Sequence, residues 1–279
     1  MGFTRWEEAV QWLMGQPDQQ DLVRACYYDL PRREAAARYW HSDEWREVRA
    51  LSPSPSGKAL DIGAGHGITS YALAKDGWQV VSLEPDPSRL IGAGAIRQLA
   101  SAEKLSIEVV RASGERLPFE ESAFQFVLAR QTLHHAKDLP LLCAEAFRVL
   151  APGGLFVALR EHVLSRPSDL PKFLDRHPLH RLYGGENAFI LSQYTSALKN
   201  SGFIIRKVLR SFDSVINYAP RSEKMLQEEI SQRIEKAPWG GKLFEFLFPG
   251  REGFMNFLKY LSLFDRRPGR PFSFICQKP

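Results

Sequence analysis

The strongest constraint on the fold is an alternation of short apolar runs with helix-forming stretches between residues 58 and 159. The expected strands are 58–62, 78–83, 106–111, 124–129 and 155–159, and the expected helices between them are 68–75, 87–101 and 138–150. Strands that alternate with helices form a parallel sheet with right-handed crossovers. We therefore predict an α/β fold with a doubly wound, Rossmann-like sheet.

The segments on either side of this alternation have a different character. Residues 1–50 resemble a set of helices, and the Pro- and Ser-rich stretch 51–57 separates them from the first strand. After Arg160 the pattern predicts a loop, then a helix at 191–200, a strand at 203–208, mainly helices at about 213–268 and a closing strand at 272–276. We therefore divide the chain at these limits into four regions: 1–50, 51–165, 166–190 and 191–279.

Composition excludes several classes of protein. Hydrophobic residues make up 44% of the chain and charged residues 25%, which is typical of a folded globular protein. The longest run without a formal charge is 62–74, well short of the roughly 20 apolar residues that a spanning helix needs. The three cysteines form no disulfide or zinc pattern, and the first residues show no secretory signal. We expect a cytoplasmic protein without a membrane span.

A glycine-rich loop follows the first expected strand. Gly63, Gly65 and Gly67 alternate with other residues, so three side chains that would keep a ligand away from the backbone are missing. A dinucleotide-binding loop has the spacing G-x-G-x-x-G, which would place its third glycine at Ile68. The second strand ends in Glu84, where an acid can accept hydrogen bonds from both hydroxyls of a ribose. The loop therefore indicates a nucleoside cofactor other than a dinucleotide.

Further motifs follow in a fixed order and support a family resemblance. They are the loop Asp61 to Gly67, the acid Glu84, the stretch Ser113 to Phe119, the run Arg130 to His135 and the turn Arg148 to Gly154. In this order they resemble class I S-adenosylmethionine-dependent methyltransferases of the small-molecule kind, similar to quinone-biosynthesis methyltransferases. The resemblance covers about residues 55–165. It implies a seven-stranded sheet with the last strand antiparallel, here interrupted by a helical insertion between the sixth and seventh strands.

The resemblance also implies a set of cofactor contacts. The region 51–165 would bind S-adenosylmethionine and release S-adenosylhomocysteine, under a helical cap formed by the region 1–50. Ser113 stands where the family usually has Asp, which weakens the expected bond to the adenine. The implied cofactor-binding residues are Asp61, Gly63, Ala64, Gly65, Glu84, Pro85, Ser113, Gly114, Glu115, Arg130, Gln131 and His135.

The expected reaction is methyl transfer to a small-molecule acceptor by in-line displacement. Alignment of the reactants supplies much of the rate, and a base helps only if the acceptor must lose a proton. Candidates for such a group follow the fourth and fifth strands: His134, Glu161 and His162. We expect Glu161 and His162 to form a pair in which the carboxylate orients the imidazole. The alternative is that these side chains only hold loops together.

The region 166–190 contains an unusually polar segment that we expect to form a lid over the acceptor. Its candidate substrate-binding residues are His177, His180, Tyr183, Glu186 and Asn187. A metal site from His177, His180 and Glu186 is the weaker interpretation, and we predict no metal. The aromatic stretch 244–264 has helical spacing, which favours a core face over a tunnel or a dimer interface.

Two other functional classes remain open from the sequence. The chain could bind the same cofactor for chemistry other than methyl transfer, or it could be a non-catalytic cofactor-binding module. A nucleic-acid substrate is not expected, because no dense basic stripe with interleaved aromatic residues is visible. We expect a monomer or a homodimer. The acceptor and its reacting atom (O, N or C) stay undetermined.

Overall fold

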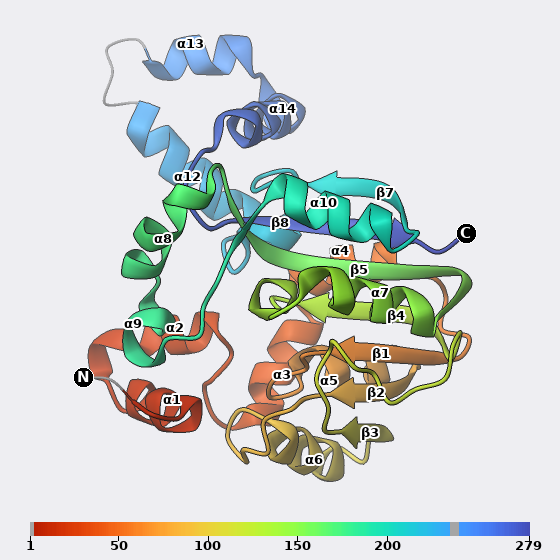
Figure 1. Ribbon diagram of the computed structural model, residues 1–279. Helices are drawn as coiled ribbons and strands as arrows, with labels where there is room; N and C mark the ends of the chain where they lie inside the picture. The colour runs from red at the N-terminus through yellow and green to blue at the C-terminus, as the bar shows by residue number, and fades with distance from the viewer. Residues whose placement is uncertain (1–2, 235–239) are drawn as a thin grey trace.

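The computed structural model describes residues 3–234 and 240–279 and has one mixed sheet at its centre (Figure 1). The strand order is β3-β2-β1-β4-β5-β8-β7, and the short β6 pairs with β5 beside this path. Among the described strands, only β8 is antiparallel to its neighbours, β5 and β7. The strands are β1 (Lys58–Ile62), β2 (Gln79–Leu83), β3 (Ile107–Val110), β4 (Phe124–Arg130), β5 (Leu150–Leu164), β6 (Phe189–Ile190), β7 (Ile204–Leu209) and β8 (Arg270–Gln277).

Helices cover both faces of the sheet, which confirms the doubly wound α/β prediction. On one face α7 and α10 (Leu191–Asn200) bury residues such as Ala146 and Leu198 against the strands. On the other face α3, α4, α5 and α11 (Val215–Tyr218) form a second apolar layer around Tyr39 and Trp45. The helices up to β5 are α1 (Trp6–Met14), α2 (Gln20–Ala25), α3 (Arg32–Trp40), α4 (Asp43–Leu51), α5 (Ile68–Lys75), α6 (Ala93–Ala102) and α7 (Leu139–Val149), with the 3-10 turns η1 (Pro17–Gln19) and η2 (Leu133–His135).

Three details of the prediction need correction. The described sheet has eight strands rather than seven, because β6 adds a two-residue pairing to the end of β5. The fifth strand is much longer than 155–159, since β8 pairs along it as far as Val163. The second helix begins at Ala93 instead of Pro87, because Asp86 and Ser88 accept backbone hydrogen bonds and hold the chain in turns before it.

The segment 161–188 is also not a plain loop. It contains η3 (Pro167–Asp169), α8 (Leu170–Arg176) and α9 (Pro178–Tyr183), each with a proline in its first turn. Proline is favoured at that position because its missing N–H would be unsatisfied there anyway. The prolines taken as signs of a loop therefore mark helix starts.

The helical insertion between β7 and β8 has a small apolar core of its own. It comprises α11 (Val215–Tyr218), α12 (Glu223–Ile234), α13 (Gly240–Leu247) and α14 (Gly250–Phe264), after α10 (Leu191–Asn200) and β7. Phe254 and Leu258 are buried there, as expected for a core face, whereas Phe246 and Phe264 are 81% and 75% exposed. Among the described residues, no helix combines the length and the apolar character needed to cross a membrane.

Candidate functional site

The glycine loop has the backbone conformation that its sequence demands. Gly63, Gly65 and Gly67 have φ angles of 68°, 55° and 91°, in the left-handed region that glycine adopts most easily. A Cβ on Gly63 would lie 2.5 Å from Cγ2 of Thr132, so this position also lacks space for a side chain. The loop links the end of β1 to the first turn of α5.

Glu84 lies directly beside this loop. Parallel pairing of Ile62 with Leu83 brings the ends of β1 and β2 together. One oxygen of the Glu84 carboxylate accepts the N–H of Gly65 at 2.7 Å, and the other accepts the N–H of Asp86 at 2.9 Å. Burial outweighs these bonds and raises the pKa of Glu84 to about 7. The carboxylate is therefore fixed at the loop and retains acceptor capacity for hydroxyl groups.

A third loop, which follows β3, completes this edge of the sheet. The backbone N–H of Glu84 donates to the carbonyl of Val110, the last residue of β3. Beyond it, Ser113 donates its hydroxyl to Glu115, whose carboxylate also accepts the N–H of Lys137 at 2.9 Å. A Cβ on Gly114 would come within 3.0 Å of Leu142. Three of the predicted cofactor segments therefore lie at the carboxyl ends of three adjacent strands, where open α/β sheets bind ligands.

Other predicted cofactor residues already have protein partners. Arg130 forms a buried ion pair with Glu44 of α4 at 2.7 Å, and its guanidinium stacks over Tyr39. Gln131 accepts a hydrogen bond from Arg130, while Pro85 is exposed. Asp61 is buried and accepts the hydroxyl of Ser70 at 2.6 Å, whereas Ala64 lies in the loop and donates to the carbonyl of Leu83. Their roles toward a cofactor stay predictions.

A cluster of histidines and carboxylates lies at the ends of β4 and β5. His134, in η2, donates from Nδ1 to Glu161 at 2.7 Å, and Glu161 also accepts the backbone N–H groups of His134 and Thr132. The predicted pair of Glu161 with His162 is therefore wrong, because Glu161 orients His134 instead. Neighbouring residues of a strand direct their side chains to opposite faces, so Glu161 reaches the turn after β4 instead. His162 directs Nδ1 to the carbonyl of Gly269 at 3.1 Å.

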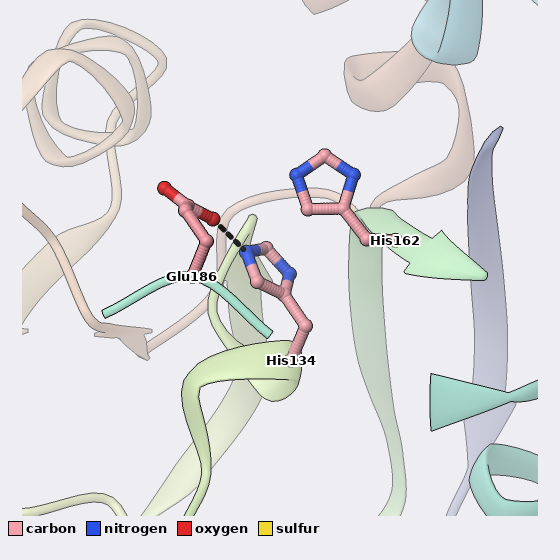
Figure 2. Close-up of side chains that lie close together, drawn as sticks. All are labelled: His134, His162 and Glu186. Atoms are coloured by element: carbon pink, nitrogen blue, oxygen red, sulfur yellow. Dashed lines mark ion pairs between the residues drawn. The ribbon is translucent and has the colours of Figure 1, made fainter. Parts of the chain in front are cut away.

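Glu186 enters the same cluster from the segment after α9 (Figure 2). One carboxylate oxygen lies 3.6 Å from Nε2 of His134, and the other lies 3.8 Å from Nδ1 of His177. Burial alone would raise the pKa of Glu186, but the surrounding histidines outweigh it and lower the pKa to about 2. For His134 the two effects have the opposite sign. Burial alone would lower its pKa, but the carboxylates of Glu161 and Glu186 outweigh burial and raise the pKa to about 9.

The remaining residues of the polar segment take different places. Tyr183 is exposed and lies 5.9 Å from Trp6 of α1, measured between ring centroids. His135 directs Nδ1 to the carbonyl of Gly185 at 3.1 Å. His180 has a buried Nδ1 without a partner among the described residues, and Asn187 is half-buried. The structure thus brings His177 and Glu186 to the histidine cluster and leaves Tyr183 at its rim.

The N-terminal helix α1 covers this cluster. The N–H of Phe3 donates to the carbonyl of Leu182, and the ring of Trp6 lies 6.2 Å from that of His135. A small pocket opens between α1 and α9, lined by Trp6, Ala9, Val10, Leu179, Leu182, Tyr183, Gly184 and Glu186. Farther along the chain, Tyr28 lies 5.3 Å from His66 of the glycine loop.

Sequence reasoning missed three residues of this region. Thr132 holds the carbonyl of Ile62 beside the glycine loop, Glu44 neutralises Arg130, and His66 carries a buried Nε2 with no partner among the described residues. His66 was visible within the glycine motif itself. No sequence pattern pointed to Glu44 as the partner of Arg130, because the two residues lie 86 positions apart along the chain.

Comparisons with known proteins agree with this arrangement. A family model described as a methyltransferase domain matches residues 60–158. An uncharacterized methyltransferase of Mycobacterium sp. (strain JLS) is 36% identical over 141 residues, which cover 50% of this chain and 51% of that protein. The ubiquinone/menaquinone biosynthesis C-methyltransferase UbiE of Brucella anthropi is 26% identical over 195 residues, covering 68% and 72%.

Solved structures extend the likeness to the whole fold. Geranyl diphosphate C-methyltransferase from Streptomyces coelicolor, solved with Mg²⁺, geranyl diphosphate and S-adenosyl-L-homocysteine, matches with a TM-score of 0.58 and 14% identity. The match covers 100% of this chain and 90% of that one. The chain spans about half the length of the first curated relatives that it matches. The resemblance to class I methyltransferases noted in the motifs is confirmed.

Proposed function

Because residues 60–158 match the family model of a methyltransferase domain, we propose that this protein transfers a methyl group from S-adenosylmethionine to a small-molecule acceptor. The observation that carries the proposal is the meeting of three loops at one sheet edge: the glycine loop, Glu84 with its backbone bonds, and Ser113 to Glu115. The left-handed glycines and the buried carboxylate fit a nucleoside cofactor with a ribose.

Each loop of this edge has a distinct task in the proposal. The glycine loop approaches the methionine moiety, Glu84 accepts the ribose hydroxyls, and the loop after β3 lies along the adenine. The cofactor supplies an electrophilic methyl group on a positively charged sulfur. Its departure leaves a neutral thioether, so the protein mainly has to align the reactants and exclude water.

The acceptor in this proposal lies between the sheet edge and the cover formed by α1 and α9. His134 is oriented by Glu161, and its Nε2 lies 3.6 Å from Glu186, which lines the neighbouring pocket. Glu161 is then a positioning residue, because it acts through His134. The cytoplasmic location and the monomeric or homodimeric state expected from the sequence stay predictions.

Calorimetric titration with S-adenosylhomocysteine tests the cofactor site. We expect binding by the wild-type protein, and a loss of at least tenfold in affinity for Glu84→Ala, because the ribose hydroxyls lose their acceptor. Glu108→Ala is the matched control, since this exposed carboxylate lies on the neighbouring β3.

Thermal melts give a second readout of the same site. Ligand at 100 times its Kd stabilises the fold by about 2.7 kcal/mol. A shift caused by NAD and not by S-adenosylmethionine, or equal binding by wild-type and Glu84→Ala proteins, contradicts the proposal.

A further inference from the structure

The strongest unexplained feature is the set of ligating side chains at the ends of β4 and β5. From the positions of His134, His162 and Glu186 (Figure 2) we propose that this cluster binds a divalent transition-metal ion of the zinc class. One nitrogen or oxygen atom from each of the three side chains lies within 4.8 Å of the others'. The sequence alone predicts no metal, and the weaker set of ligands that it offers contains His177 and His180 beside Glu186.

The spacing of His134 and Glu186 fits an ion better than a hydrogen bond. Nε2 of His134 and the nearer oxygen of Glu186 are 3.6 Å apart. A hydrogen bond between nitrogen and oxygen spans about 2.7–3.2 Å. Two ligands at about 2.0–2.2 Å from a tetrahedral zinc ion are instead separated by about 3.3–3.6 Å. The two atoms are therefore at the distance at which one ion can join them.

In both histidines a hydrogen bond from Nδ1 fixes the ring and leaves Nε2 as the atom that would bind the ion. Nδ1 of His134 is bound to the Glu161 carboxylate at 2.7 Å, and Nδ1 of His162 is bound to the Gly269 carbonyl at 3.1 Å. Those oxygens only accept, so each Nδ1 carries a proton. Nε2 of His134 also carries a proton in the metal-free protein at neutral pH, because Glu161 and Glu186 raise the pKa of His134 to about 9, and the ion displaces that proton when it binds. A carboxylate or carbonyl behind the ring is the usual surrounding of a metal-ligating histidine. The two Nε2 atoms belong to η2, directly after β4, and to β5.

Glu186 supplies the second, independent sign of a missing ligand. Its side chain is 5% exposed, and its oxygen Oε2 is buried without a hydrogen-bond partner among the described residues. Two histidine Nε2 atoms face this oxygen, His134 at 3.6 Å and His135 at 3.9 Å, and both lie beyond hydrogen-bond distance. A buried carboxylate oxygen without a hydrogen bond is costly, and folded proteins rarely retain one. A cation held with His134 and His162 satisfies this oxygen.

Three protein ligands leave a fourth position open, as in catalytic rather than structural zinc sites. Glu186 also lines the pocket between α1 and α9, next to the place assigned to the acceptor. This step rests on the proposed function. The acceptor is then a hydroxyl compound whose oxygen binds the ion and loses its proton to water. The new O–C bond forms as the C–S bond breaks, and the electron pair of that bond stays on sulfur.

Metal binding by the full-length protein tests the site without any activity assay. The protein is dialysed against a chelator and titrated with Zn²⁺ alone, and bound zinc is counted by elemental analysis. We expect one Zn²⁺ per chain. Glu186→Gln and His162→Gln should lose it, and Glu161→Gln should weaken it by about 10–100-fold, because the support behind His134 is removed. His41→Ala is the control, since this exposed histidine lies outside the cluster.

The Co²⁺ complex of the wild-type protein keeps the test decisive if a variant fails to fold. We expect visible absorption bands of a four- or five-coordinate ion with nitrogen ligands. A spectrum of six-coordinate aqueous Co²⁺, no bound zinc, or zinc retained in folded Glu186→Gln protein overturns the proposal.

The two proposals fail separately. Binding of S-adenosylhomocysteine by a protein that takes up no zinc removes the metal site alone. Zinc uptake by a protein that binds no S-adenosylhomocysteine leaves the metal site in place and removes the proposed methyl transfer.

Discussion

The conformation of the glycine loop depends on single residues, through their backbone angles and the room available for a side chain. Gly63 combines a left-handed φ of 68° with a close approach of Thr132. Gly153, in β5, has a similar φ of 76°, but no atom lies within 4 Å of the position that a Cβ would take there. The two glycines therefore separate the cost of backbone strain from the cost of lost space.

Gly63→Ala should remove binding of S-adenosylhomocysteine and destabilise the fold more than Gly153→Ala does. A left-handed alanine costs roughly 1–2 kcal/mol, and the contact with Thr132 adds to it only at position 63. Calorimetry measures the binding, and denaturant unfolding measures the stability. Equal stability losses in the two variants would show that space at Thr132 is irrelevant.

Asp61 makes stability depend on pH. Burial raises the pKa of Asp61 to about 7, although the Ser70 hydroxyl donates to the carboxylate. The folded pKa lies above the ordinary value, so the protonated form is favoured in the fold. This contribution is complete at pH values below about 4 and is lost as the pH rises through 7.

Asp61→Asn should therefore flatten the pH dependence of unfolding between about pH 4 and 8, because asparagine keeps the acceptor for Ser70 without ionising. Urea unfolding at several pH values measures it. Asp175→Asn is a control, since Asp175 is exposed. An unchanged pH slope in Asp61→Asn would contradict the assignment.

At the scale of elements, caps and strand pairing decide where helices and strands begin. Ser42 accepts the N–H of Trp45 at 3.1 Å and so caps α4, as Ser42 and the acids after it predict from the sequence. The prolines of α8 and α9 were misjudged because the same residue marks a turn and a helix start. The extent of β5 was unpredictable from its own residues, since pairing with β8 lengthens it.

Ser42→Ala should destabilise the protein by about 0.5–2 kcal/mol, the usual value of a lost N-cap. Ser54→Ala is the matched control, because Ser54 is exposed in the stretch 51–57 beyond the end of α4. Chemical denaturation measures both. A loss in Ser54→Ala as large as that in Ser42→Ala would exclude the cap as the cause.

At the scale of the whole molecule, a buried ion network joins the N-terminal helices to the sheet. Glu44 of α4 pairs with Arg130 at the end of β4, and Arg160 of β5 lies 3.9 Å away. The strand ends and their motifs were predictable, because periodicity and glycine spacing are local. The partners that meet there, such as Glu44 with Arg130 and Glu161 with His134, depend on folding and were not.

Glu44→Gln should cost about 3–5 kcal/mol, because it removes the buried counterion of two guanidinium groups that are only 12% and 15% exposed. Glu47→Gln is the control on the same helix, where the carboxylate is exposed. Thermal and chemical unfolding measure the difference. A loss below about 1 kcal/mol in Glu44→Gln would mean that water already solvates and screens the two guanidinium groups.

The place of β8 in the sheet has a consequence for synthesis on the ribosome. Along the chain it is the last of the described strands, yet it lies between β5 and β7, and β7 has no other neighbour in the described sheet. Until β8 emerges, one edge of β5 and the whole of β7 present unpaired backbone groups, which are a template for aggregation. The nascent chain therefore carries these unpaired edges from the synthesis of β5 until that of β8, which then joins β7 to the rest of the sheet.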